Sequence, residues 1–248
     1  MKKLAIVALV AVAASSVWAM KGTIHTDRDT KTGEITWKPG SKTYSIQLKN
    51  STVEYPFADV TKLEIEKPKN LDQLIQTKNV PGLKKIVQDY HMLQWDKPAC
   101  RALVTAYLES SPANPKEAYE VARKIVEEDK REAYIGDLAP AYWRALQATG
   151  RKPQLEACLK KAANEGDRRS SAEALMMRGD LIAQDDQPAS HKKALIDAYL
   201  RVALLYQESE CRETRIEALQ RCATSFVKIG QKSRAEDMKT LAQQLMSK

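Results

Sequence analysis

Two matching stretches constrain the fold of this chain more than any other feature. The sequence LQATGRKPQLEAC begins at Leu146, and FVKIGQKSRAEDM begins at Phe226. Glycine, lysine and glutamate fall in step in the two stretches, at Gly150/Gly230, Lys152/Lys232 and Glu156/Glu236. A repeated junction between apolar-periodic segments is typical of recurring helical pairs, which bury their wide apolar faces by stacking on one another.

Capping residues mark the ends of these helices. Asn114 precedes Pro115 and stands three residues before Glu117, which predicts an N-cap, a proline in the first turn and a capping box. Ser233 with Glu236 repeats the capping-box spacing. Glycines after apolar-periodic stretches are expected to close helices in the left-handed conformation, at Gly150, Gly166 and Gly230.

The helical region is predicted to start near residue 71. A short helix is expected over 71–77 and another over 81–93. Four pairs come next, predicted over 97–110 with 115–128, 137–149 with 153–164, 169–183 with 188–207, and 212–229 with 233–246. A single pair cannot bury apolar faces as wide as the one in 188–207, so the sequence predicts a mainly α protein, with a solenoid of about four to five helical pairs.

The region before the helices has a period of two. Apolar and aromatic residues alternate in four runs, around Ile35 and Trp37, from Tyr44 to Leu48, from Val53 to Phe57, and at Leu63 and Ile65. These runs predict four half-buried strands, with a fifth near residues 23–26, in a small antiparallel SH3-like β domain over 20–68. Such a short segment is expected to pack on later residues of the chain, and Trp37 and Trp143 are expected in cores. The helical domain is expected over 69–248.

The first residues resemble a secretory signal peptide. Lys2 and Lys3 precede an apolar run that is shorter than a bilayer span, and small residues come after it. We expect residues 1–19 to be removed after Ala19, leaving an exported periplasmic, secreted or cell-surface protein of a bacterial envelope with no transmembrane anchor. The formal net charge is +8, but export makes nucleic acid an unexpected partner.

The helical region resembles the tetratricopeptide repeat (TPR). That family has W-x-x-L-G-x-x-Y in the first helix of each pair and A-x-x-x-F in the second, with a period of about 34 residues. Anchor positions here are filled by Tyr107, Leu146, Ile182 and Phe226, and the small residue at the helix crossing by Ala106, Gly179 and Ala223. The second helices carry small residues at Ala118 and Ala122, Ala194 and Ala198, and Ala235. The period is longer and looser than in the family, and a generic helical repeat is the alternative.

The resemblance implies a ligand groove lined by the first helix of each pair. Family contact positions fall here on Arg101, Thr105, Arg144, Gln147, Asp180, Gln220, Thr224 and Lys228. This polar and net basic set implies a protein or peptide partner that presents an extended segment with acidic side chains or a free carboxylate. The alternative is that these residues form only the solvated face of amphipathic helices.

The sequence offers little for catalysis. Its three histidines lie in separate segments, and the sequence contains no glycine-rich phosphate loop, no G-x-S-x-G and no H-E-x-x-H motif. We expect a non-enzymatic binding or scaffold protein without cofactor or metal. The alternatives are glycan or envelope-polymer binding through the β domain, and an enzyme whose distant polar residues converge on folding.

The four cysteines are mostly expected to form no disulfides. Cys211 and Cys222 are about 16 Å apart if they share one helix, beyond the reach of a disulfide. The other two, Cys100 and Cys158, fall on helices that a regular stack would not make neighbours.

Overall fold

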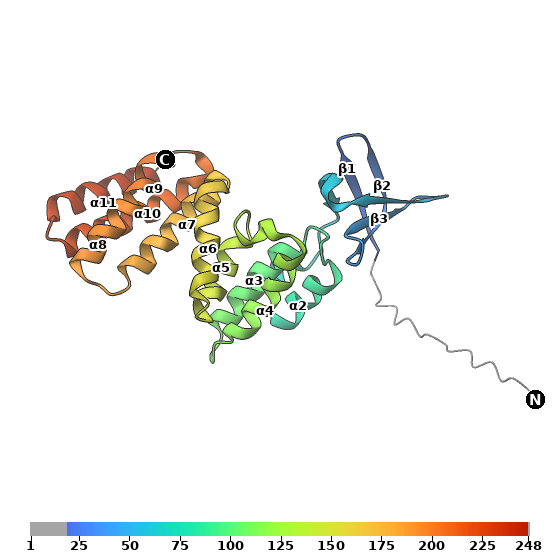
Figure 1. The fold of residues 1–248 in the computed structure, drawn as a ribbon, viewed down its shortest axis with the longest axis horizontal. Helices are drawn as coiled ribbons and strands as arrows, with labels where there is room; N and C mark the ends of the chain where they lie inside the picture. The colour runs from blue at the N-terminus through green and yellow to red at the C-terminus, as the bar shows by residue number, and fades with distance from the viewer. Residues whose placement is uncertain (1–18, 248) are drawn as a thin grey trace, which may run out of the picture. The chain divides into compact units, whose positions relative to one another are not determined.

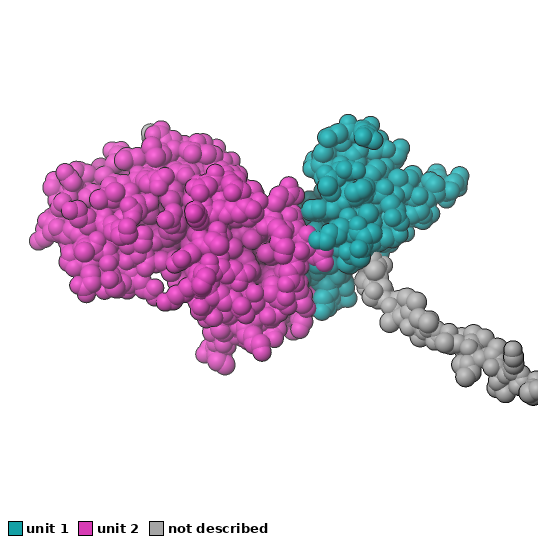
Figure 2. All heavy atoms as spheres, viewed as in Figure 1, with its two compact units in different colours: residues 1–69, 85–96 teal, residues 70–84, 97–248 magenta. Residues whose placement is uncertain are grey.

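The computed structural model describes residues 19–247, so the predicted signal peptide lies outside the described residues apart from Ala19. An antiparallel sheet comes first and helices come after it (Figure 1). The chain divides into two compact units, coloured separately in Figure 2. Unit 1 holds the described residues up to Lys69 together with Lys85–Asp96, and unit 2 holds Asn70–Lys84 and Lys97–Lys248.

Unit 1 contains a five-stranded sheet with the strand order β4-β3-β2-β1-β5. The strands are β1 (Met20–Thr26), β2 (Thr30–Lys38), β3 (Thr43–Gln47), β4 (Thr52–Pro56) and β5 (Val60–Ile65). All four predicted strands are confirmed, and the run near residues 23–26 forms the fifth strand. The register pairs Ile35 with Ile46 and Trp37 with Tyr44. All four side chains are buried, so the alternating pattern places one face of the sheet in the core.

A segment from the helical part of the sequence completes the core of unit 1. Met92 and Leu93 are buried against the sheet. The Tyr44 hydroxyl donates to the Met92 carbonyl at 2.8 Å, and the Trp95 indole N–H donates to the Ile65 carbonyl at 2.8 Å. The expectation that the short β region needs later residues for its core is therefore confirmed.

Unit 2 is helical. Its principal helices are α3 (Asp96–Glu109), α4 (Pro115–Glu128), α5 (Ala139–Ala148), α6 (Lys152–Glu165), α7 (Arg168–Ala183), α8 (Pro188–Ala194), α9 (Leu200–Leu205), α10 (Arg212–Lys228) and α11 (Lys232–Met246). They are preceded by α1 (Leu71–Gln76) and α2 (Val80–Asp89), of which α2 belongs to unit 1 from Lys85 onward. The boundaries of the four predicted pairs lie within two residues of the observed ones. Successive helices from α4 to α8 contact one another, as do α10 and α11.

Local capping explains most of these boundaries. The Asn114 side chain accepts a hydrogen bond from the Glu117 backbone at 3.3 Å, as predicted. Gly150 and Gly230 have φ angles of 70° and 78°, so both take the left-handed conformation that was expected after a helix.

Two capping predictions are wrong. Gly166 is extended, with φ −71° and ψ 164°, because the chain passes directly into Asp167, whose carboxylate caps α7 by accepting from the Ser170 backbone at 2.7 Å. Ser233 lies inside the first turn of α11, which begins one residue earlier after Gln231, and its N-cap makes no side-chain hydrogen bond.

The helix predicted over 188–207 is interrupted at its centre. Residues Leu195–Tyr199 form a π-helical turn between α8 and α9. The buried Tyr199 ring lies against Gly179 of α7, where an added Cβ would stand 2.4 Å from a ring carbon. Its hydroxyl donates to the Asp180 carboxylate at 2.7 Å. Gly179 is thus the small residue that lets this pair of helices approach closely.

The described helices include none with the length and apolar character needed to cross a bilayer.

Candidate functional site

The predicted groove residues all lie in unit 2, on the first helix of each predicted pair. Seven of the eight are exposed and Thr105 is half-buried. They stand on α3 (Arg101, Thr105), α5 (Arg144, Gln147), α7 (Asp180) and α10 (Gln220, Thr224, Lys228).

Three of these residues line one hollow. Gln220, Thr224 and Lys228 are spaced at steps of four residues, so they lie on one face of α10. With them, the hollow of about 400 Å³ is lined by Ala223, Val227 and, from α11, Lys239. Val227 is 49% exposed, which gives the hollow an apolar wall beside two ammonium groups.

Both lysines of the hollow are ion-paired within the chain. The Lys228 ammonium lies 2.7 Å from a carboxylate oxygen of Asp186, and the Lys239 ammonium lies 2.7 Å from Glu236. The hydrogen bond from Lys228, with a smaller one from His191, lowers the pKa of Asp186 below its usual value. These pairs are exposed, so an incoming carboxylate competes with them at little cost.

The remaining charged groove residues belong to other clusters. Arg101 lies 3.8 Å from Asp137, and Arg144 lies 3.5 Å from Glu109. Asp180 accepts from Tyr199 and from the Arg221 guanidinium at 3.0 Å. The arginines that were expected to face a ligand are therefore paired with carboxylates of neighbouring elements.

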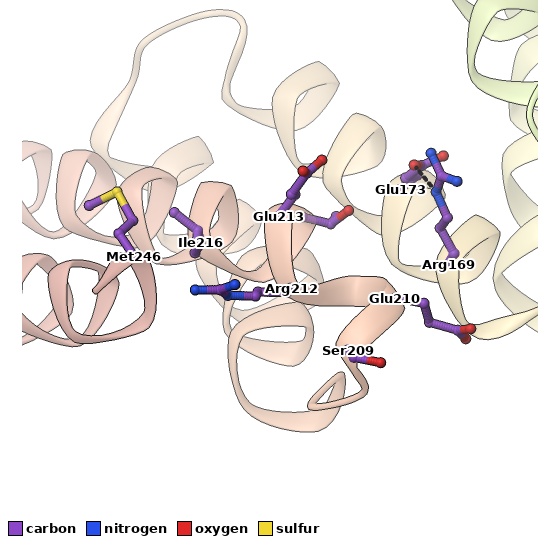
Figure 3. Close-up of a pocket in the computed structure, with 9 residues that line it drawn as sticks. Arg169, Glu173, Ser209, Glu210, Arg212, Glu213, Ile216 and Met246 are labelled. Atoms are coloured by element: carbon purple, nitrogen blue, oxygen red, sulfur yellow. Dashed lines mark hydrogen bonds and ion pairs between the residues drawn. The ribbon is translucent and has the colours of Figure 1, made fainter. Parts of the chain in front are cut away.

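A second cavity lies where α7, the start of α10 and the end of α11 contribute side chains (Figure 3). Its volume is about 580 Å³, and its lining consists of Arg169, Glu173, Ser209, Glu210, Arg212, Glu213, Thr214, Ile216 and Met246. No sequence motif marks these residues, because they come from three separate segments. Three glutamates against two arginines make the lining acidic overall.

Both arginines of this cavity are bound within the chain. Arg169 donates to Glu173 at 3.1 Å and to Asp137 at 3.0 Å, while Arg212 donates to the Leu245 carbonyl at 2.6 Å. Burial raises the pKa of Glu173, against the opposing charge of Arg169. The cavity therefore does not present its arginines freely to an anion.

One polar chain has the composition of a hydrolytic triad. His191 Nδ1 lies 3.1 Å from the Ser225 hydroxyl, and its Nε2 lies 2.9 Å from an Asp186 carboxylate oxygen. Ser225 is only 2% exposed, so its hydroxyl is closed to a substrate in this structure. These hydrogen bonds instead link Asp186, in the loop after α7, to α8 and α10. The spacing of histidines in the sequence could not reveal this network.

Neither a metal-ligand cluster nor a disulfide occurs in the described part of the chain. Residues 19–247 contain no group of three or more histidine, cysteine, aspartate or glutamate side chains that could hold a metal ion. All four cysteines, which lie within this range, are thiols outside any disulfide, as predicted.

Comparison with known proteins gives no assignment, since no family model, curated protein or solved structure matches this chain.

Proposed function

We propose that this protein is a non-enzymatic, exported binding protein whose TPR-like helical unit holds an extended peptide segment of an envelope protein in the hollow of α10 and α11. The peptide carries a carboxylate, from an acidic side chain or its C-terminus, next to an apolar side chain.

The observation that carries this proposal is the hollow on α10. Gln220, Thr224 and Lys228 were selected by resemblance to TPR ligand positions, and all three line it. An amide, a hydroxyl and an ammonium can bind peptide carbonyls and a carboxylate, while Val227 offers an apolar contact.

The TPR-like architecture has support from packing between paired helices. Gly179 stands at a position that the family fills with a small residue, and the Tyr199 ring occupies the space that a Cβ would need. Phe226 and Leu146, two of the anchor positions, are buried. Helices joined by short loops at such crossings build the rigid surfaces that repeat proteins use for binding.

Peptide binding tests the proposal. The purified chain is applied to an array of extended peptides that carry either a free or an amidated C-terminus. We expect dissociation constants of ~10–100 µM for peptides with a carboxylate beside an apolar residue, as is typical of a small and shallow contact. The double variant Lys228→Ala/Lys239→Ala should lose at least tenfold in affinity.

The control is Lys160→Ala, which removes an exposed lysine of α6 and should leave binding unchanged. Equal binding by the wild type and the double variant, or equal binding of free and amidated peptides that lack acidic side chains, would contradict the proposed site.

A hollow in unit 1 favours glycan binding as a second candidate. Its volume is about 320 Å³, and it is lined by Thr26, Asp27, Arg28, Asp29, Glu54, Tyr55, Pro56, Ala58 and Asp59. An aromatic ring beside several carboxylates suits sugar hydroxyls, and the acidic lining favours neutral over anionic polymers. Retention of the wild type, but not of Tyr55→Ala, on a neutral polysaccharide would support this function.

A further inference from the structure

The outer face of α8 and α9 carries an apolar stripe. Ile196, Leu200 and Leu204 are spaced at steps of four residues and form the stripe. Leu205, the next residue, is also exposed but lies about 100° around the helix from Leu204. Ile196 is 58% exposed, Leu204 55% and Leu205 60%, whereas Leu200 is half-buried. Ile196, Leu204 and Leu205 have the highest exposed fractions among the large apolar side chains of the described residues.

The ends of this stripe lie off the core face of the helix, because Ile196 and Leu204 are exposed, whereas Leu200 packs partly against the core. The core face consists of His191, Ala194, Leu195, Ala198, Tyr199, Val202, Ala203 and Tyr206, all buried. A helix that is apolar on the side opposite to its core is normally covered by another element. No residue of the stripe lines the proposed peptide hollow.

An aspartate and an arginine lie beside the stripe, and each would face the other's charge in a second, antiparallel copy of the helix. Asp197 and Arg201 stand on either side of residue 199, and Ile196 and Leu204 stand on either side of Leu200. The Arg201 side chain makes no hydrogen bond or ion pair with any other residue that the structure describes. Among the described residues, the Asp197 side chain is bound by Lys193 of the preceding turn at 2.7 Å.

We propose that a second copy of this chain covers the stripe, in an isologous dimer with the two α8–α9 segments antiparallel about Leu200. A two-fold axis there sets Ile196 of each copy against Leu204 of the other. The Asp197 carboxylate then lies within about 3 Å along the helix axis of the other copy's Arg201, since each residue advances 1.5 Å. The same surface of each copy thus supplies both the apolar contacts and the ion pairs of the dimer.

The charges favour a second copy over an anionic membrane. A membrane-binding helix places cations along both sides of its apolar face, but here a carboxylate stands next to the centre of the stripe and already neutralises Lys193. The stripe spans about 12 Å from Ile196 to Leu204, which makes a small interface and a weak dimer.

Sedimentation velocity on the purified chain tests the dimer. We expect a dissociation constant of ~10–100 µM. Ile196→Lys/Leu204→Lys should raise it at least 100-fold. Leu241→Lys is the matched control, because it places the same charge at a 42% exposed leucine of α11 away from the stripe, and it should leave the dimer intact.

Charge exchange tests the antiparallel register. Asp197→Arg alone sets like charges against each other and should weaken the dimer about tenfold, whereas Asp197→Arg/Arg201→Asp should restore it. Circular dichroism checks that the variants stay helical.

Three results would overturn the proposal. They are a monomer at every concentration up to ~1 mM, a dimer that Ile196→Lys/Leu204→Lys leaves unchanged, and a monomer whose binding to phosphatidylglycerol vesicles is lost in the same variant. The last would assign the stripe to a lipid surface. None of them bears on the peptide hollow.

Discussion

Single small residues allow helices to approach each other closely, and the clearest case is Gly179 of α7, which lies against the Tyr199 ring. In an exposed helix, replacing glycine by alanine stabilises by about 1 kcal/mol through propensity. Here the new Cβ would stand within 3 Å of three Tyr199 ring carbons. The ring is 1% exposed and its hydroxyl is bound to Asp180, so it has little room to move. The clash therefore outweighs the propensity gain.

We accordingly expect Gly179→Ala to lower the free energy of unfolding by about 1–2 kcal/mol, measured by urea denaturation. Arg178→Ala, at the exposed neighbouring position, should change it by less than about 0.5 kcal/mol. A Gly179→Ala variant as stable as the wild type would show that the two helices can separate freely.

Asp186 should make stability depend on pH in the acid range. Its pKa is lowered in the folded chain by the hydrogen bond from Lys228 and then by His191. As pH falls, the unfolded chain takes up this proton first, at about pH 4. The stabilisation is therefore complete above that pH and is lost as pH falls through the lower folded pKa.

Thermal unfolding from pH 7 down to pH 2 checks this sign. Asp186→Asn should unfold at a lower temperature than the wild type at pH 7, and the difference should shrink as pH falls. Asp237→Asn, an exposed aspartate of α11, serves as the control and should match the wild type throughout. A difference that grows with acidity would refute the assignment.

At the scale of elements, helix ends show which local signals can be trusted. Asn114 caps α4 through its side chain, whereas Ser233, with the same capping-box spacing in sequence, lies inside α11. Asn114→Ala should therefore lower the free energy of unfolding by about 1 kcal/mol, and Ser233→Ala should have almost no effect. Chemical denaturation of both variants tests this, and equal losses would mean that α11 begins later than the structure shows.

The sequence determines helix positions better than helix contacts. Apolar periodicity and proline at helix starts predict the outer bounds of the paired helices closely, but not the interruption of 188–207, because these signals are local. The extended Gly166 was missed because a loop of two residues leaves no room for a left-handed turn before Asp167. No local sequence signal predicted the π-helical turn at Leu195–Tyr199, which ends at the residue whose ring packs against Gly179.

In the candidate site too, the sequence predicts which residues share a helix face but not which residues of other helices join them. Gln220, Thr224 and Lys228 come together because their spacing on one helix places them on one face. Lys239 joins them through the packing of α11 on α10, which no spacing predicts. Arg101 and Arg144 are drawn to Asp137 and Glu109, residues that are remote in sequence.

For the whole molecule, stability comes from packing without covalent links between the described residues. Unit 1 has a core around Ile35, Trp37 and Tyr44, and part of unit 2 has one around Tyr199 and Phe226. All four cysteines are thiols, at Cys100, Cys158, Cys211 and Cys222. Burial raises the pKa of Cys222 to about 12, so its thiol is both hidden and protonated at neutral pH.

Thiol titration with a chromogenic disulfide reagent should therefore find four thiols in denatured, unreduced protein. In the native protein at pH 8, labelling of Cys222 should be limited by unfolding, because only the unfolded chain exposes its thiol. Reductant should leave the unfolding temperature unchanged, since no disulfide constrains the unfolded chain. Two thiols instead of four, together with a midpoint that falls on reduction, would require the cysteine-bearing helices to be neighbours and would contradict the packing order of α3 to α11.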